Sequence, residues 1–185
     1  LFLITPSWAD DISDFQIEKM SIGDSALDFF SKQDIKENSW DYYKDKEYTP
    51  VQMPNFPFFK TYDYVDFDFK TNDPAYTIHA LYGVTNYNEI KNCYKEMDKI
   101  VLEMSDTFKN ISKKDKKDIE RDPRYTGDPT GKTIVTRVSF WFYNGDRASV
   151  SCYDYFTEEG DDGDNLTVGL QTKEQNEFLL NRAYK

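Results

Sequence analysis

One segment of the sequence, Asn86 to Phe108, restricts the possible folds more than any other, because its apolar side chains recur at steps of three and four residues. These side chains are Ile90, Cys93, Tyr94, Met97, Ile100, Val101, Met104 and Phe108. That spacing places them on one face of an α-helix, so the segment predicts an amphipathic helix of about six turns. Such a helix must bury its apolar face against another element, which the neighbouring segments have to supply.

The segments before the predicted helix have the alternating pattern of β-strands. Thr61 to Lys70 and Ala75 to Val84 both alternate with a period of two, and the turn sequence Asn72-Asp73-Pro74 separates them. This arrangement predicts a β-hairpin. The apolar side chains that share one face of its first strand are Val65, Phe67 and Phe69.

After the helix, Thr133 to Phe156 contains two further strands around Tyr143-Asn144-Gly145. A two-residue Asn-Gly turn would place Phe140 opposite Ser149 and mix apolar with polar side chains on one face. A three-residue loop, with Gly145 in the left-handed conformation, keeps the apolar side chains of both strands together. We therefore predict the three-residue loop. The shared apolar face would consist of Val138, Phe140, Phe142, Ala148, Val150 and Cys152.

The sequence predicts helices near both ends of the domain. Residues 12–38 have two capping-box spacings, Ser21 to Asp24 and Ser31 to Asp34, which indicate short helices. Near the other end, Leu166 to Leu170 reads as a last strand, and Thr172 begins a capping box for a C-terminal helix. The resulting order, α-ββ-α-βββ-α, predicts a single α+β domain over residues 10–185. Its antiparallel sheet would have about five strands and be packed by the long helix.

Two segments lack a period and are predicted to be irregular. Lys109 to Gly131 is a long polar stretch, which we expect to be a mobile connection. Asn38 to Lys60 alternates aromatic residues with Pro50, Pro54 and Pro57, and we expect a loop packed by its own side chains.

The aromatic side chains of Asn38 to Lys60 are candidate partner-binding residues. Tyr and Trp offer a large apolar area together with a hydrogen-bonding tip, which suits them as anchors for a peptide or a sugar. The same rings could instead belong to the core, because long connections often cover an open sheet face or edge. The sequence leaves both alternatives open for Trp40, Tyr42, Tyr43, Phe56, Phe58 and Phe59.

The first residues have the features of the end of a secretory signal peptide. The apolar run Leu1-Phe2-Leu3-Ile4 is followed by small residues at Ser7 and Ala9, and then by the acidic Asp10. We expect residues 1–9 to be a signal-peptide remnant cleaved after Ala9, which would make the product periplasmic or secreted. An ordinary first strand is the alternative.

The charge of the chain excludes some classes of partner. With a formal net charge of −11, the protein is not expected to bind nucleic acid or anionic membrane surfaces, because those contacts need clustered Lys and Arg. No apolar stretch approaches the roughly 18 residues that a membrane span requires, so we expect no membrane span. The oligomeric state cannot be read from the sequence.

The two cysteines of the chain both lie at positions predicted to point inward. Cys93 falls on the apolar face of the long helix, and Cys152 falls on the apolar face of a strand. In an oxidising compartment such a pair would form a disulfide. Two separate buried thiols are the alternative, because the sequence does not give the distance between them.

No catalytic, metal or cofactor site emerges from the remaining residues. Asp66 and Asp68 share a strand face that we expect to be the wet side of the hairpin. The single histidine, His79, has no second ligand nearby in the sequence and is expected to be structural. Glu158 to Asn165 reads as a solvated acidic turn, with weak calcium binding as the alternative. Gly127 to Thr133 lacks one residue of a phosphate-binding loop.

Several short motifs give the chain a resemblance to known proteins. They are Asp14-Phe15-Gln16-Ile17-Glu18, Met20-Ser21-Ile22-Gly23-Asp24-Ser25, Ile90-Lys91-Asn92-Cys93-Tyr94-Lys95 and Val150-Ser151-Cys152-Tyr153-Asp154. With them the chain resembles a family of small uncharacterised exported proteins of marine alphaproteobacteria. This resemblance implies an exported domain with one cysteine in the helix and one in the strand. Met20 to Phe30 is also similar to the opening helix of the small outer-membrane barrel-assembly lipoprotein.

These features lead to two hypotheses of different classes. The first is a non-enzymatic binding or interaction module of the cell envelope, whose partner would be an envelope protein, a peptide or a glycan. The second is a carboxylate-dependent hydrolase of envelope polymers, with its site among Asp66, Asp68 and His79. A deep polar cleft that joins these three residues would favour the enzyme, and an aromatic patch would favour the binding module.

Overall fold

The computed structural model describes residues 11–54, 56–119, 131–156 and 163–185. The expected signal-peptide remnant, 1–9, lies outside these residues. So does most of the acidic turn, and so does most of the glycine-containing segment that begins at Gly127.

The described chain forms one antiparallel sheet of seven strands, in the order β1-β2-β3-β7-β6-β5-β4. Each strand pairs antiparallel with its neighbours. The strands are β1 (Tyr48–Pro54), β2 (Tyr64–Lys70), β3 (Ala80–Tyr87), β4 (Ile111–Ile119), β5 (Ile134–Phe142), β6 (Arg147–Asp154) and β7 (Asp164–Gln171). The α+β class and the antiparallel sheet are therefore as predicted, but the sheet has seven strands where about five were expected.

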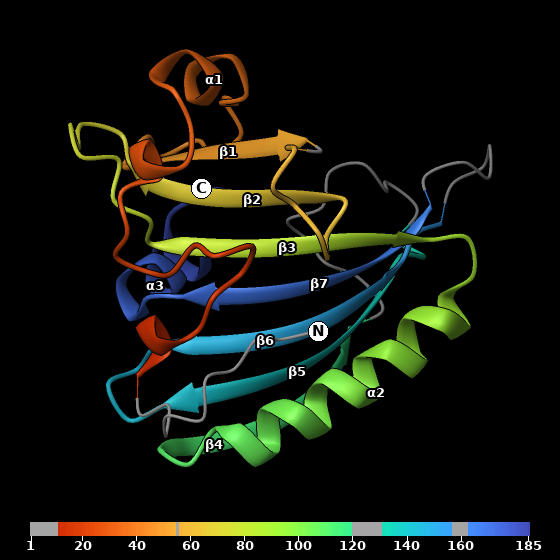
Figure 1. Ribbon diagram of the computed structural model, residues 1–185. Coiled ribbons are helices and arrows are strands. Elements are labelled where there is room, and N and C mark those ends of the chain that lie inside the picture. Colours follow the sequence, from red (N-terminus) through yellow and green to blue (C-terminus); the bar gives the residue numbers. More distant parts are fainter. Residues whose placement is uncertain (1–10, 55, 120–130, 157–162) are drawn as a thin grey trace.

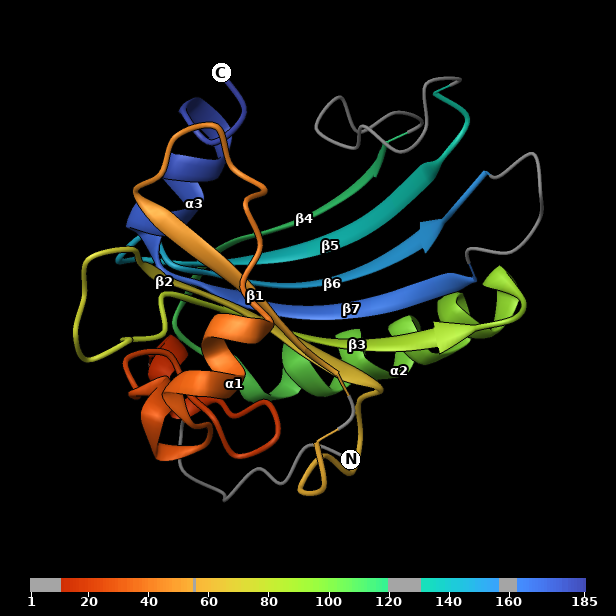
Figure 2. The same cartoon turned by 90° about the horizontal axis from the view of Figure 1, so that it is seen from above.

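Helices lie on both faces of the curved sheet (Figures 1 and 2). The long helix α2 (Ile90–Thr107) packs on one face together with α1 (Lys32–Glu37) and the N-terminal segment. The C-terminal helix α3 (Lys173–Asn181) lies on the opposite, concave face (Figure 2). Two short 3₁₀ helices, Ile12–Asp14 and Ala26–Asp28, complete the N-terminal segment.

The main core lies between α2, the N-terminal segment and the sheet. The side chains of Cys93, Met97, Ile100 and Met104 point inward from α2, as their spacing predicted. Phe108, which follows the helix, packs edge-on against Phe15 of the N-terminal segment and also against Phe140 of β5. Apolar side chains therefore fill the space between the helices and this face of the sheet.

The predicted turn between β5 and β6 is confirmed. Phe140 pairs with Ala148, and Gly145 has a positive φ of 92°. The backbone N–H of Phe142 donates to the carbonyl of Asp146 at 2.9 Å, which closes the three-residue loop. This register places the apolar side chains of both strands in the core, so the polar ones lie together on the concave face.

Two predictions for the N-terminal segment have different outcomes. Ser31 and Asp34 form the expected capping box at the start of α1. Ser21 and Asp24 instead stabilise a turn, in which the backbone N–H of Ser21 donates to Asp24 at 2.8 Å. Met20 to Phe30 contains only a short 3₁₀ helix, so the continuous opening helix implied by the lipoprotein likeness is absent from this described segment.

Two strands lie in segments that were predicted to be irregular. Asn38 to Lys60 contains β1, whose residues Pro50 and Pro54 are tolerated because β1 ends the sheet. The polar stretch after α2 contains β4, which ends the sheet on the other side. The expectation of a mobile connection is therefore wrong for 111–119.

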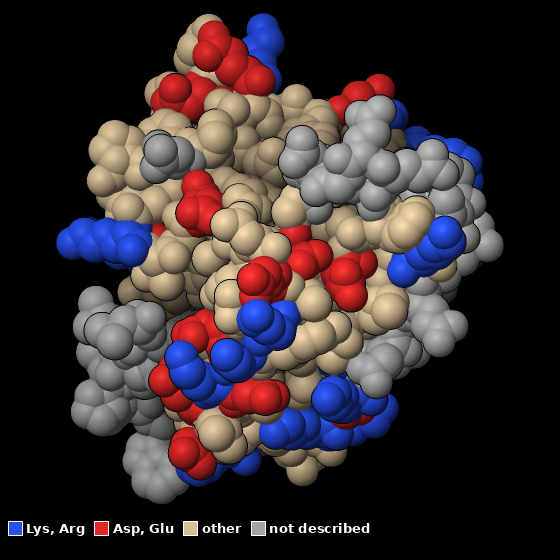
Figure 3. All heavy atoms as spheres, turned by 90° about the vertical axis from the view of Figure 1, so that its right-hand side faces the viewer, with Lys and Arg blue, Asp and Glu red and all other residues tan. Residues whose placement is uncertain are grey.

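Surface charges of both signs are mixed on the face of the molecule drawn in Figure 3. On α2, Lys99 forms an ion pair with Glu96 at 2.7 Å.

In the described ranges, none of the helices is both long enough and apolar enough to cross a membrane.

Candidate ligand-binding site

The concave face of the sheet carries polar side chains in register across its central strands. Asp66 on β2 pairs with Tyr82 on β3, and Tyr82 pairs with Gly169 on β7. Gly169 in turn pairs with Ser149 on β6. This row begins with a carboxylate and an aromatic ring and continues through two small residues, which add little bulk to the concave face.

A cavity of about 420 Å³ lies on this face. The sheet forms its floor, and its walls come from two other parts of the chain. Trp40, Tyr42 and Tyr43 extend over it from the segment before β1, and Leu179 and Tyr184 extend over it from α3 and the residues that follow. Cavities that hold small organic molecules are of this size, and aromatic walls with a few polar groups are typical of them.

Gly169 determines the shape of the floor. A Cβ atom at this position would lie 2.7 Å from the ring of Tyr82. Because Gly169 has no side chain, the Tyr82 ring can lie against β7 and form part of the cavity lining. Burial raises the pKa of the Tyr82 phenol well above its ordinary value, so this group stays protonated and can donate a hydrogen bond.

One carboxyl oxygen of Asp68 is hydrogen-bonded to two other parts of the protein. Its Oδ2 accepts hydrogen bonds from the phenol of Tyr43, at 2.9 Å, and from the side-chain amide of Gln175. Gln175 accepts from Gln171 at 2.9 Å, and Gln171 accepts from Arg147. This chain of hydrogen bonds connects β2, α3, β7 and β6, so Asp68 holds α3 and the segment before β1 onto the sheet.

Asp66 is less buried than Asp68. The residue is half-buried and lines the cavity, yet its Oδ1 is buried and accepts no hydrogen bond from the described part of the chain. Burial raises the pKa of Asp66 to about 7, and a hydrogen bond from Gln52 opposes this shift. Burial raises the pKa of Asp68 to about 7 as well, against the hydrogen bonds from Tyr43 and Gln175.

The expectation that Asp66 and Asp68 lie on a wet surface is wrong for Asp68, while Asp66 is half-buried and lines the cavity. Strand alternation did place them on the face opposite Val65 and Phe67. That face is covered, however, because α3 and Tyr43 lie over it, and Asp68 is only 3% exposed.

Arg137 lies toward the opposite side of the cavity from Asp66. Its Nε donates to Ser151 at 2.8 Å, and its Nη2 donates to the phenol of Tyr153 at 2.9 Å. Within the described ranges no carboxylate forms an ion pair with it. Arg137 therefore adds a positive charge to a cavity whose other side carries Asp66.

The six aromatic candidates do not form one patch. Trp40 and Tyr42 line the cavity and are 48% and 43% exposed, while Tyr43 is buried beside them. The other three are half-buried and pack around Phe30 against the core on the opposite side of the sheet: Phe56, Phe58 and Phe59. The core alternative therefore holds for these three rings and for the buried Tyr43, whereas partner binding by Trp40 and Tyr42 stays a prediction.

His79 does not join the two carboxylates. It is absent from the cavity lining, and its ring lies 5.5 Å from that of Tyr48, measured between centroids. Burial lowers the pKa of His79, which favours the neutral imidazole. In the described ranges there is also no cluster of three or more His, Cys, Asp or Glu side chains that could hold a metal ion.

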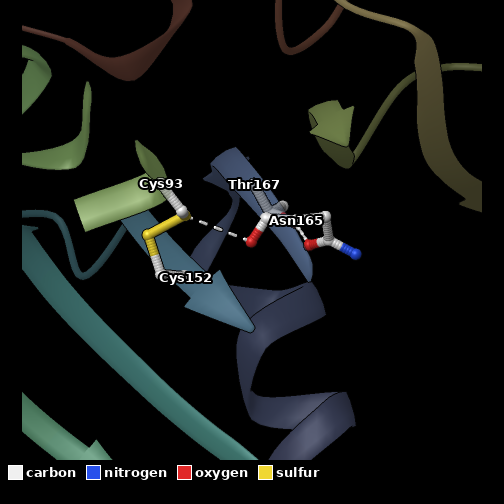
Figure 4. Close-up of a disulfide and its surroundings, with 4 residues drawn as sticks. All are labelled: Cys93, Cys152, Asn165 and Thr167. Carbon is white, nitrogen blue, oxygen red and sulfur yellow. Dashed lines mark hydrogen bonds between the residues drawn. A yellow bond between two sulfur atoms is a disulfide. The ribbon is translucent and has the colours of Figure 1, made fainter. Parts of the chain in front are cut away.

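The predicted cysteine pair is joined in the structure (Figure 4). Cys93 of α2 and Cys152 of β6 form a disulfide, with their Cα atoms 5.9 Å apart. The Cys93 sulfur lies 3.4 Å from the backbone oxygen of Asn165, which is a contact because a disulfide sulfur has no proton to donate. The Asn165 side chain accepts from Thr167 at 3.2 Å, and both residues line the cavity.

Several lining residues were not singled out from the sequence, including Tyr64, Tyr82, Arg137 and Arg147. A signal for the arginines was present, since the predicted three-residue turn places them on the face opposite Phe140. The curvature of the sheet and the position of α3 have no such signal.

No protein-family model, curated protein or solved structure matches the chain. The family resemblances drawn from the sequence therefore stay predictions. The function has to be inferred from the geometry of the cavity.

Proposed function

We propose that the protein is a non-enzymatic binding module of the cell envelope whose ligand occupies the concave cavity. One observation carries this proposal. A cavity of about 420 Å³ is lined by aromatic rings and also by Asp66, whose buried Oδ1 has no partner in the described part of the chain. A carboxyl group among aromatic rings in a cavity of this size suits a small organic ligand that donates a hydrogen bond to it.

Export from the cytoplasm is part of the same proposal. The disulfide between Cys93 and Cys152 supports it, because disulfides persist mainly in oxidising compartments. The periplasm is the compartment that the expected signal peptide would reach.

The hydrolase is the second candidate, and one observation favours it. Asp66 and Asp68 share a strand face beside one cavity, and burial raises the pKa of each to about 7. A carboxyl group with such a pKa can act as a general acid at neutral pH. Against this, both hydrogen bonds to Asp68 come from residues that hold the fold together. Asp68 is therefore better explained as a structural residue.

Binding can be tested with variants of the exposed rim of the cavity. Trp40→Ala combined with Tyr42→Ala should weaken binding at least ten-fold, since both rings line the opening. The melting temperature should change by less than about 3 °C, because single exposed side chains contribute little to stability. A calorimetric titration with a panel of short peptides and of mono- to trisaccharides measures the affinity.

Tyr143→Ala is the matched control for these variants. Tyr143 is 73% exposed on the turn between β5 and β6 and does not line the cavity. Equal loss of binding in the control and in the rim variant would show that the ligand does not occupy the cavity. Turnover of a panel saccharide that Asp66→Asn abolishes would favour the hydrolase.

A further inference from the structure

The cavity carries opposite charges at two separate places. Asp66 lies on β2, and Arg137 lies on β5, with three strands between them in the sheet. Neither residue forms an ion pair with the other or with another described residue. A ligand that fits both places has a donor group at one end and an acidic group at the other.

At the Asp66 end, the cavity is lined by a carboxyl group, which accepts hydrogen bonds from donors. Oδ1 accepts nothing from the described chain, while Gln52 donates to the same carboxyl group. An ammonium group is the donor that best matches a carboxylate, because charge-assisted hydrogen bonds are stronger than neutral ones. The aromatic rings of Tyr64 and Tyr82, which also line the cavity, are compatible with a cation near this end.

At the Arg137 end, two hydrogen bonds hold the guanidinium in place, and its other N–H groups remain to donate to a ligand. It has five N–H groups, and the structure uses one on Nε and one on Nη2, for Ser151 and Tyr153. These two bonds fix its orientation. A fixed guanidinium with remaining N–H donors is suited to a carboxylate, which it can bind through two parallel hydrogen bonds.

The distance between the two ends limits the length of the ligand. Four inter-strand spacings of about 4.8 Å put the Cα atoms of Asp66 and Arg137 roughly 19 Å apart along the sheet. Both side chains extend over the concave face, and Arg137 reaches toward β6, which leaves a gap on the order of 10 Å. Three residues of extended peptide span about 10 Å. The two charged groups of a single amino acid are too close together.

The middle of the cavity can accept peptide side chains. Its lining includes the Tyr82 ring and the small side chain of Ser149, and the half-exposed rings of Trp40 and Tyr42 bound its opening. We propose that the cavity takes a peptide of about three residues with free ends, its ammonium group at Asp66 and its carboxylate at Arg137. This inference rests on the proposed binding function and names the class of ligand.

Titration calorimetry of the full chain with Ala-Phe-Ala tests the inference. Acetylation of the peptide N-terminus and amidation of its C-terminus should each weaken binding at least ten-fold, because each removes one charge. These comparisons use the unaltered protein, so they do not depend on the folding of a variant.

Two variants assign each end of the peptide to its residue. Asp66→Asn should weaken binding of Ala-Phe-Ala at least ten-fold and change binding of the acetylated peptide less than two-fold. Arg137→Gln should weaken binding of the free peptide at least ten-fold and change binding of the amidated peptide less than two-fold. Asp98→Asn, on the exposed face of α2, should leave every affinity unchanged.

Each outcome bears on a different claim. Equal affinities for the free and capped peptides would overturn the inference. Binding of maltotriose but of no peptide, lost on Trp40→Ala with Tyr42→Ala, would also overturn it and leave the binding function standing. If neither the peptides nor the saccharides of the panel bind, both the inference and the proposed function fail.

Discussion

Among single residues, Asp68 has the clearest consequence for stability. Burial raises its pKa from an ordinary 3.8 to about 7 in the folded protein. Between about pH 4 and pH 7 the folded state therefore keeps a proton that the unfolded state releases. Because the folded state binds more protons in this range, the free energy of unfolding decreases as the pH rises. Below pH 4 and above pH 7 the free energy of unfolding no longer changes with pH because of Asp68.

Asp68→Asn should remove this contribution. The amide oxygen can still accept from Tyr43 and Gln175, but it does not titrate. From pH 4 to pH 8 the variant should gain stability relative to the wild type by about 1.4 kcal/mol for each unit of the lost pKa shift. Urea unfolding across this range measures the difference. Asp98→Asn is the exposed control. If the free energy of unfolding depended on pH identically in Asp68→Asn and in the wild type, the raised pKa of Asp68 would be contradicted.

Gly169→Ala tests the close packing beneath the cavity. A Cβ atom 2.7 Å from the Tyr82 ring would force that ring to move. Overpacking of this kind costs about 1–3 kcal/mol, so chemical denaturation should show a loss in that range. At Gly163 a Cβ would have its nearest neighbour at an ordinary 3.4 Å, which makes Gly163→Ala the matched control. Equal stability of the two variants would mean that the Tyr82 ring can move aside for a Cβ atom at position 169 without cost.

The sequence predicted residue faces better than residue environments. Alternation correctly opposed Asp66 and Asp68 to Val65, Phe67 and Phe69. Whether a polar face is wet depends on what covers it, and the cover comes from α3, more than a hundred residues away along the chain, as in the bond from Gln175 to Asp68. A local pattern contains no information on such a contact.

Among the elements, those with strong apolar periodicity were predicted and the two edge strands were not. α2 and the β5–β6 register follow from apolar spacing, because their side chains fill the core. β4 has a sequence rich in lysine and is exposed at most positions from 111 to 116, so it lacks that pattern. In β1 the prolines argued against a strand, although an edge position tolerates them.

The lysines of β4 protect an edge of the sheet. An exposed edge strand can pair with another molecule, and charged side chains prevent this. Lys113→Val combined with Lys116→Val should therefore increase self-association, measured by size-exclusion chromatography with light scattering. Lys91→Val with Lys95→Val removes the same charge from the exposed side of α2 and should not associate. A monomeric β4 variant would show that the edge is protected in another way.

For the whole molecule, the disulfide connects the helical layer to the sheet. Cys93 and Cys152 are 59 residues apart in sequence and join α2 to β6. Replacing both by Ala should lower the free energy of unfolding by about 4 kcal/mol in the chain-entropy model. The cavity should keep its ligand, because the bond lies on the opposite side of the sheet from it. Mass spectrometry after thiol blocking should detect no free thiol in the wild type, and two labelled cysteines would contradict the bond.

The cavity is the feature of the molecule that the sequence predicts least well. Its position depends on the curvature of seven strands and on where the chain ends come to lie, and neither leaves a local pattern. The sequence identified Trp40, Tyr42 and Tyr43 as candidates because aromatic residues are unusually frequent near β1. It could not separate them from Phe56, Phe58 and Phe59, since composition does not show which side of the sheet a ring packs on.

The position of Trp40 gives the molecule an intrinsic optical reporter. Its indole lines the cavity while remaining 48% exposed, so its fluorescence arises at the boundary between water and the binding space. A molecule entering the cavity displaces water from that ring and changes the colour and intensity of its emission. Occupancy can thus be followed in solution without a label, with Trp40→Phe identifying the part of the signal that comes from the cavity.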